Sequence, residues 1–152
     1  MAATPKGIYY PDSNTNADFV AIFSTLASSV DSALGDFTYD SGWINVSDSE
    51  LSGGWENYNT SSNQFSYRRV GKWVACKGRL RRGTPGATFF TLPVGFRPPG
   101  LMYFTAERNA NLSATVNLQV FPSGAMESRS SGSDSINWLP LTSIHFFTDD
   151  EI

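Results

Sequence analysis

The densest group of side chains able to bind a charged ligand is a run of basic residues in the middle of the chain. Seven of the eleven Lys and Arg residues lie within residues 68–82. There Lys77, Arg79 and Arg81 occupy alternate positions, so a strand would present all three on one face. Guanidinium groups form bidentate hydrogen bonds to phosphate and carboxylate. This basic face predicts either an anionic polymer as ligand, or ion pairs with the acidic residues of 36–56 in the same or a neighbouring subunit.

Three aromatic residues flank Gly- or Ser-rich segments of the sequence. They are Trp55, Tyr58 and Trp138, and their flat rings could stack on sugars. Packing in the core is the alternative use of such side chains. The predicted ligand-binding set combines the aromatic and basic residues: Trp55, Tyr58, Lys77, Arg79, Arg81 and Trp138.

Residues suited to catalysis are sparse. The single histidine, His145, lies in an apolar segment where a structural role is expected, whereas a serine-type mechanism needs a base that a carboxylate orients. One His and one Cys, Cys76, cannot assemble an ordinary zinc site, and no Gly-rich phosphate-binding motif occurs. Glycoside hydrolysis needs two carboxylates, but Glu50 and Glu56 are explained more simply as acids that solvate a turn. We therefore expect no enzymatic activity, no cofactor and no metal, and a buried structural thiol at Cys76.

The composition narrows the class of protein and its partners. Only 16% of the residues are charged, 14% are aromatic, and Gly and Pro recur throughout, a balance typical of an all-β domain. The net charge is −3 and no binding motif accompanies the basic run, so we expect no nucleic acid partner. The longest apolar run, residues 19–23, is far short of a membrane span, which needs about 20 residues. No signal peptide is recognisable, so we expect synthesis in a cytoplasm and no membrane partner.

The order of short apolar segments indicates how the basic and aromatic residues are positioned. Strict alternation over residues 112–120 predicts a half-buried strand, and residues 65–70 and 72–82 predict a hairpin around Gly71. Residues 93–100 form a loop because their prolines exclude a central strand. With about eight or nine such strands spaced roughly 8–12 residues apart, residues 36–152 are predicted to form an antiparallel β-sandwich or jelly-roll head.

Residues 16–35 form the only convincing helix, after an extended arm of residues 1–15. Asn16 or Asp18 can cap its start, and Gly35 suits the left-handed residue just past its end. Such a helix rises only about 27 Å and is marginal alone in water. Its apolar seam has spacings of four and three residues, so it packs either on the sheet of its own domain or in a parallel three-helix bundle between copies. The predicted trimerisation residues are Phe19, Ile22, Phe23, Leu26, Val30 and Ala33.

Two groups of segments resemble phage proteins. The segment TLPVGFRPP (residues 91–99), the strands LMYFTA and NLQV, a Pro-x-Gly turn and the final WLPLTSIHF together resemble the C-terminal head domains of bacteriophage tail fibres and minor tail proteins. The start PKGIYYP and the helix ADFVAIFSTLASSVDSAL resemble small minor tail proteins of phages that infect actinobacteria.

The resemblance implies a homotrimeric virion protein with a helical stalk and β-sandwich heads. It further implies that the heads bind the host surface, for example a cell-wall polysaccharide, and that the arm of residues 1–15 contacts other virion proteins. It favours the trimeric bundle and a place on the tail. Most tail fibres carry a long N-terminal shaft, where this chain has at most fifteen residues before the helix. A capsid fibre or decoration protein with a purely structural role is therefore the alternative.

Overall fold

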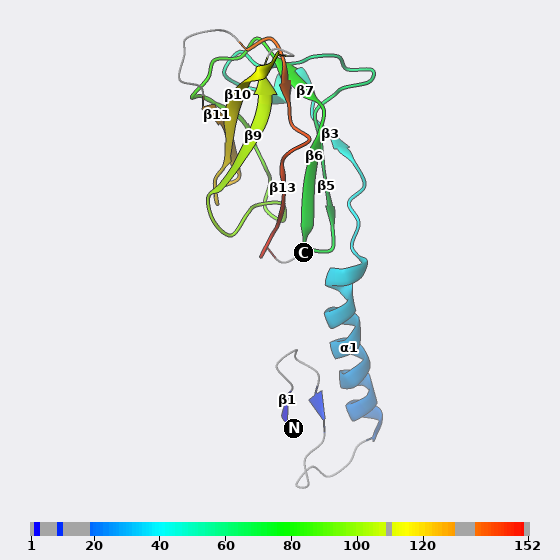
Figure 1. Ribbon diagram of the computed structural model, residues 1–152. Coiled ribbons are helices and arrows are strands. Elements are labelled where there is room, and N and C mark those ends of the chain that lie inside the picture. Colours follow the sequence, from blue (N-terminus) through cyan, green and yellow to red (C-terminus); the bar gives the residue numbers. More distant parts are fainter. Residues whose placement is uncertain (1, 4–8, 11–18, 109–110, 130–135, 151–152) are drawn as a thin grey trace. The chain divides into compact units, whose positions relative to one another are not determined.

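The computed structural model describes residues 2–3, 9–10, 19–108, 111–129 and 136–150 (Figure 1). The chain divides into two compact units, Met1–Tyr39 and Asp40–Ile152. In the first unit, β1 (Ala2–Ala3) pairs antiparallel with β2 (Tyr9–Tyr10), and the helix α1 spans Phe19–Thr38. The second unit contains the remaining strands and is called the head below.

The helix α1 ends three residues later than the sequence pattern predicts. The Tyr39 N–H donates to the Gly35 carbonyl at 3.1 Å, and the Thr38 hydroxyl donates to the Leu34 carbonyl at 3.3 Å. Gly35 is therefore inside the helix, and the prediction that it follows the last turn is wrong. The physical reason is that residues after Gly35 continue the helical hydrogen bonds, with Thr38 bonding back to the last turn. The predicted capping residues at 16 and 18 lie outside the described residues.

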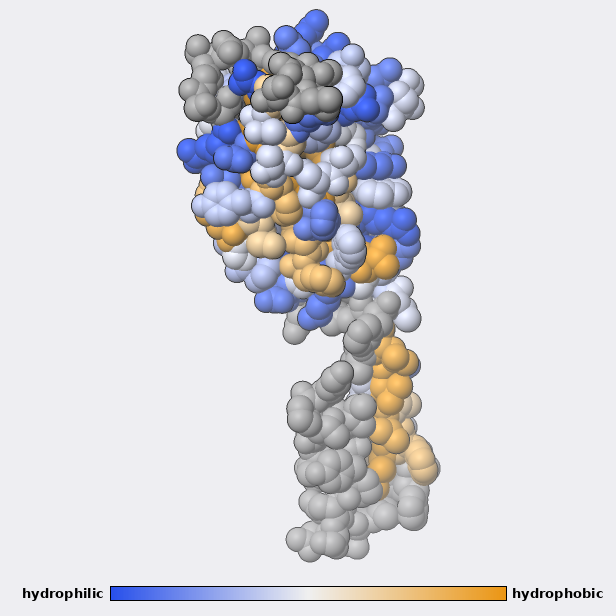
Figure 2. Space-filling model, in the orientation of Figure 1, coloured by the Kyte–Doolittle hydropathy of each residue, from blue (hydrophilic) through white to orange (hydrophobic). Residues whose placement is uncertain are grey.

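Much of the predicted seam of α1 is accessible in the single chain. Phe23 and Val30 are exposed, and Ile22 and Leu26 are half-buried. Figure 2 shows a continuous strip of apolar side chains along this helix. The side chains of the two remaining seam residues, Phe19 and Ala33, lie outside the described set.

The head is an antiparallel β-sandwich, as the sequence predicts. One four-stranded sheet has the order β8-β11-β10-β9 and faces a second with the order β13-β6-β5-β3 (Figure 1), while a three-stranded sheet has the order β12-β7-β4. A short 3-10 helix, η1, spans Asp48–Glu50. The strands are β3 (Ile44–Asn45), β4 (Glu56–Asn57), β5 (Ser66–Val70), β6 (Trp73–Lys77), β7 (Arg79–Arg81), β8 (Thr88–Thr91), β9 (Met102–Arg108), β10 (Asn111–Val120), β11 (Ala125–Arg129), β12 (Leu139–Pro140) and β13 (His145–Phe147).

The long run at 72–82 is broken into two strands that belong to different sheets. The break lies at Gly78, which has a φ of +99°, a conformation that favours glycine. A Cβ at this position would lie 2.4 Å from the Gln64 carbonyl oxygen. The close approach of these two backbones ends β6 at Lys77 and starts β7 at Arg79. The predicted hairpin of β5 and β6 around Gly71 is confirmed.

A single hydrophobic core lies between the sheets. The alternation that predicts β10 is confirmed, because Val116, Leu118 and Val120 are buried. Val74 on β6 and Leu80 on β7 are also buried, so the inward phase continues across the break. The other buried core residues are Val46, Trp55, Phe65, Tyr67, Cys76, Phe89, Phe90, Leu92, Phe96, Ala106, Met126, Ile136, Leu139, Leu141, Ile144 and Phe146.

The loop of residues 93–100 is held against the head by ring packing and hydrogen bonds. Phe96 is buried edge-on against the Tyr67 ring, with the centroids 5.0 Å apart. Arg97 Nε donates to the Leu92 carbonyl at 3.0 Å, and the Asp150 carboxylate accepts from the Gly95 N–H at 2.8 Å. These contacts give residues 93–100 a structural role in the head.

Candidate functional site

The outer face of the three-stranded sheet carries four of the six predicted ligand-binding residues. In its register Glu56 is opposite Arg81, and Leu80 is opposite both Asn57 and Leu139. Successive side chains of a strand point to opposite faces. Since Asn57, Leu80 and Leu139 are buried, their neighbours Glu56 and Arg81 point outward, and so do Tyr58, Arg79 and Trp138.

Three of these residues form an aromatic and basic group that we call the outer cluster: Tyr58, Arg79 and Trp138. The Arg79 guanidinium lies 3.9 Å from the centroid of the Trp138 ring, within the range of a cation–π interaction. The Tyr58 ring meets the Trp138 ring edge-on at 5.2 Å. The Tyr58 N–H donates to the Arg79 carbonyl at 2.9 Å, which positions the loop after β4. Tyr58 is 38% exposed and Trp138 is half-buried, so both rings retain accessible surface.

Arg81 and Arg82 share an acidic partner from the same chain. Arg81 Nε and Arg82 Nη1 lie 3.4 and 3.2 Å from the Glu56 carboxylate. The alternative interpretation, ion pairing with the acidic residues of 36–56, therefore holds for Arg81. The two guanidinium groups and the single Glu56 carboxylate leave one net positive charge beside the outer cluster.

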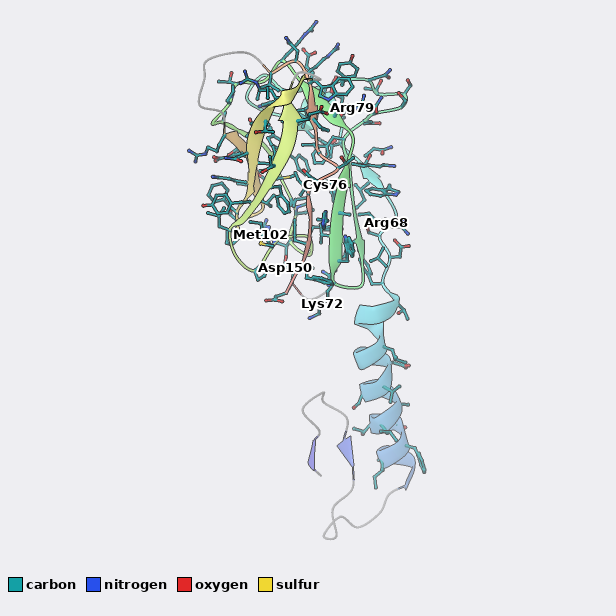
Figure 3. All side chains as sticks on the ribbon, viewed as in Figure 1. Arg68, Lys72, Cys76, Arg79, Met102 and Asp150 are labelled. Atoms are coloured by element: carbon teal, nitrogen blue, oxygen red, sulfur yellow. The ribbon has the colours of Figure 1, made fainter. Side chains whose placement is uncertain are left out.

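Lys77 is separated from the outer cluster by the break at Gly78. It belongs to β6, and its ammonium lies 4.4 Å from the centroid of the Trp43 ring. The prediction of one basic face over Lys77, Arg79 and Arg81 is wrong in this respect, because the two strands belong to different sheets. Figure 3 shows Arg79 near one end of the head and Lys72, the first residue of the run 72–82, near the other end.

Trp55 does not belong to any binding surface. Its side chain is 2% exposed and packs against Phe89, with the ring centroids 5.8 Å apart. A Cβ on Gly83 would lie 1.8 Å from the indole, so the ring rests directly on that glycine. The prediction that Trp55 contacts a receptor is wrong, and the alternative of core packing is correct.

A polar pocket of about 340 Å³ lies beside Lys77. Hydroxyl and amide side chains dominate its wall, and several are fixed by hydrogen bonds such as Ser66 Oγ to Asn45 Oδ1 at 2.7 Å. The pocket was not predicted from the sequence, where the Ser, Thr and Asn content of residues 59–63 is the one available signal. The lining residues are Asn45, Thr60, Ser61, Ser62, Asn63, Gln64, Ser66, Lys77, Gly78 and Thr142.

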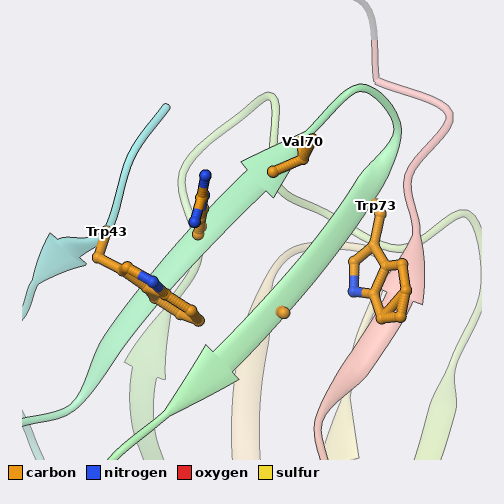
Figure 4. Close-up of a pocket in the computed structure, with 5 residues that line it drawn as sticks. Trp43, Val70 and Trp73 are labelled. Carbon is orange, nitrogen blue, oxygen red and sulfur yellow. The ribbon is translucent and has the colours of Figure 1, made fainter. Parts of the chain in front are cut away.

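A second pocket, of about 370 Å³, is apolar and lies on the outer face of the sheet that contains β5 and β6. Figure 4 shows Trp43 and Trp73 on opposite sides of the β5–β6 hairpin, with Val70 near its turn. Arg68 and Ala75 complete the lining. Sequence reasoning missed this pocket, although the alternation of β6 places Trp73 on the same face as Lys77.

The remaining reactive side chains have structural surroundings. Cys76 is buried, which confirms the prediction, and this burial raises the pKa of its thiol to about 12. His145 is exposed, and its ring centroid lies 5.7 Å from that of Trp73 and 6.4 Å from that of Phe104. Hydrogen bonds from the Ser47 N–H and hydroxyl lower the pKa of Glu50. Among the described residues, no group of three or more His, Cys, Asp or Glu is arranged to hold a metal ion.

Within the part of the chain that the structure describes, no helix is both long enough and apolar enough to cross a bilayer.

Comparison with known proteins yields matches among solved structures. No protein-family model and no curated protein matches the sequence. The crystal structure of the receptor binding protein (gp15) of Listeria phage PSA is similar over 90% of this chain and 82% of that chain, with a TM-score of 0.58 and 15% identity. The head domain of the lactococcal phage bIL170 matches 70% of this chain and 97% of its own, with a TM-score of 0.47 and 15% identity. The predicted likeness to tail proteins of actinobacterial phages stays a prediction. The chain shares the fold of a phage receptor-binding protein.

Proposed function

We propose that this chain is a virion protein of a bacteriophage, a trimeric tail-fibre or tail-tip component whose head binds the host cell surface. The observation that carries the proposal is the fold similarity to the Listeria phage receptor binding protein, which extends over 90% of the chain. The ligand is a cell-wall glycan or polymer.

The outer cluster has the chemistry that such a ligand requires. Tyr58 and Trp138 offer ring faces for stacking on sugars, and Arg79 adds a guanidinium that bonds to phosphate or carboxylate groups. The polar pocket beside Lys77 provides further hydroxyl and amide groups for bonds to a saccharide.

Three copies joined through α1 would multiply weak individual contacts. The accessible apolar residues of the helix, among them Phe23 and Val30, suit a parallel bundle between chains. Linked binding sites reach a much higher avidity than each site alone, provided that they engage the surface together. In this arrangement the arm of residues 1–15 contacts other virion proteins.

The proposal is tested with fluorescently labelled full-length protein on cells that the encoding phage infects. We expect saturable binding that unlabelled protein competes away and that reduces adsorption of the phage. Antibody labelling of intact particles should place the protein at the tail. Absence of saturable binding would contradict receptor recognition, and labelling across the capsid would favour a decoration protein instead.

A further inference from the structure

The base of the apolar pocket belongs to a wider patch of exposed apolar side chains on the head. We call it the aromatic patch: Trp43, Val70, Trp73 and Phe147, which are 40%, 46%, 45% and 68% exposed. Monomeric soluble proteins rarely expose large contiguous apolar patches, and such patches mark interaction sites. The aromatic patch is therefore a candidate interaction site.

The patch is contiguous because strand register aligns its members. Trp73 is opposite Val70 on one side and opposite Phe147 on the other, so these residues form one row across β5, β6 and β13. The Trp73 and Phe147 rings lie 6.1 Å apart. Trp43 borders the same pocket from the segment before β3. Trp and Phe are enriched in the buried parts of protein interfaces.

The aromatic patch lies where the chain enters the head. Asp40 forms an isolated bridge with Val70, and its carboxylate accepts a hydrogen bond from Arg68 Nε at 2.8 Å. The next residue, Ser41, donates its N–H to the Arg69 carbonyl at 3.0 Å. Asp40 is thus fixed at the edge of the patch. The Asp40 carboxylate also neutralises the charge of the Arg68 guanidinium. Without this ion pair, the Arg68 groups of two neighbouring copies would repel each other.

Chain connectivity then limits how far apart three such patches can be. The helix α1 ends at Thr38, and two residues span at most about 7 Å. Helices in a bundle lie about 8–10 Å apart and have a radius of about 2.3 Å at Cα. Together these limits keep Asp40 residues of neighbouring chains within about 30 Å. A head of this size has a radius of gyration of about 13 Å and is roughly 34 Å across, so the surface around Asp40 lies within reach of the neighbouring heads.

We infer that the aromatic patch is the contact between the heads of neighbouring copies of this chain. The inference rests on the proposed trimer and adds to it the face of the head that the subunits share. It assigns different roles to two surfaces: the aromatic patch holds the heads together, and the outer cluster stays accessible for the host.

The test is site-specific photo-crosslinking of the full-length protein in solution. A benzophenone amino acid replaces Trp73 in one variant and Phe147 in a second, which keeps an aromatic ring at each exposed position. Tyr103 on β9 is the matched control, because it is an exposed aromatic at 65% on the other four-stranded sheet. We expect irradiation to give covalent dimers and trimers from the Trp73 and Phe147 probes and only single chains from the Tyr103 probe.

The outcomes separate this inference from the proposed trimer. If the parent protein sediments as a trimer but neither patch probe crosslinks to another copy, the inference is overturned and the trimer stands. If the parent sediments as a single chain, the trimer and the inference both fail. If the patch probes crosslink to added cell-wall polymer in place of another copy, the patch is a receptor site and the inference is overturned.

Discussion

Replacing Trp138 with alanine tests the proposed binding surface at its central residue. The indole contacts both other members of the outer cluster, with the Arg79 guanidinium 3.9 Å away and the Tyr58 ring 5.2 Å away. Trp138→Ala removes the surface on which Arg79 rests and the edge contact of Tyr58. Both remaining side chains then lose the geometry that prepares them for a ligand.

The structure permits separate estimates for stability and for binding. The cation–π contact is worth about 0.5–1 kcal/mol, and the aromatic pair about 0.5–1.5 kcal/mol. These two contacts account for a fall of about 1–2.5 kcal/mol in the free energy of unfolding, and the lost burial of the half-buried indole adds to it. Domains have typical stabilities of about 5–15 kcal/mol, so the Trp138→Ala head remains folded at 25 °C. Loss of a central aromatic contact costs about 2 kcal/mol or more in binding, which is about 30-fold in affinity.

The assay is equilibrium binding of labelled Trp138→Ala protein to host cells, with circular dichroism to verify folding. Tyr103→Ala is the control, because Tyr103 is an exposed aromatic on β9, outside the outer cluster. We expect a weakening of about 30-fold for Trp138→Ala and parent-like binding for Tyr103→Ala. Folded Trp138→Ala protein that binds as tightly as the parent would refute the assignment of the outer cluster.

Three further predictions concern the head itself. Gly83→Ala places a methyl group 1.8 Å from a buried indole, so thermal unfolding should show a free energy of unfolding lower by about 1–3 kcal/mol or more. Gly100→Ala is the control, because its added Cβ has no heavy atom within 4 Å, and it should unfold at nearly the temperature of the parent. The hydrogen bond from Arg68 lowers the pKa of Asp40 from 3.8 to about 2. The folded state thus favours the ionised carboxylate, and its stabilisation is present above about pH 4 and is lost as the pH falls towards 2. Asp40→Asn should unfold at a lower denaturant concentration than the parent at pH 7, and a persistent difference at pH 2 would contradict this cause. Because burial raises the pKa of Cys76 to about 12, a thiol reagent at pH 8 should modify it only after unfolding, and rapid labelling of folded protein would show that the thiol is accessible.

The alternation of apolar residues was sufficient to predict the sandwich. It placed Val116 and Leu118 of β10 in the core, and it gave the correct inward phase on both sides of Gly78. The break at Gly78 was not predictable, because the alternation continues through it without a change of phase. What separates the strands is the close approach of the Gln64 backbone, a contact that local patterns do not encode.

Local sequence could not separate the two tryptophans of the predicted set. Both Trp55 and Trp138 flank loops, yet Trp55 is buried on Gly83 and Trp138 lies under Arg79. The partner that decides each case is distant in sequence. The predicted end of α1 is wrong for the opposite reason. Gly35 is a strong local stop signal, but the hydrogen bonds of Thr38 and Tyr39 continue the helix past it.

The most direct test of the account is sedimentation equilibrium of the full-length protein at micromolar concentration. The proposed mode of action depends on three chains joined along α1, so we expect a mass three times that of the 16.6 kDa chain. Leu26→Asp puts a charge into the apolar seam, at a cost of several kcal/mol (about 3–5) per subunit, and should give the mass of one chain. A parent mass equal to one chain, or a Leu26→Asp mass equal to that of a trimeric parent, would contradict the trimeric bundle.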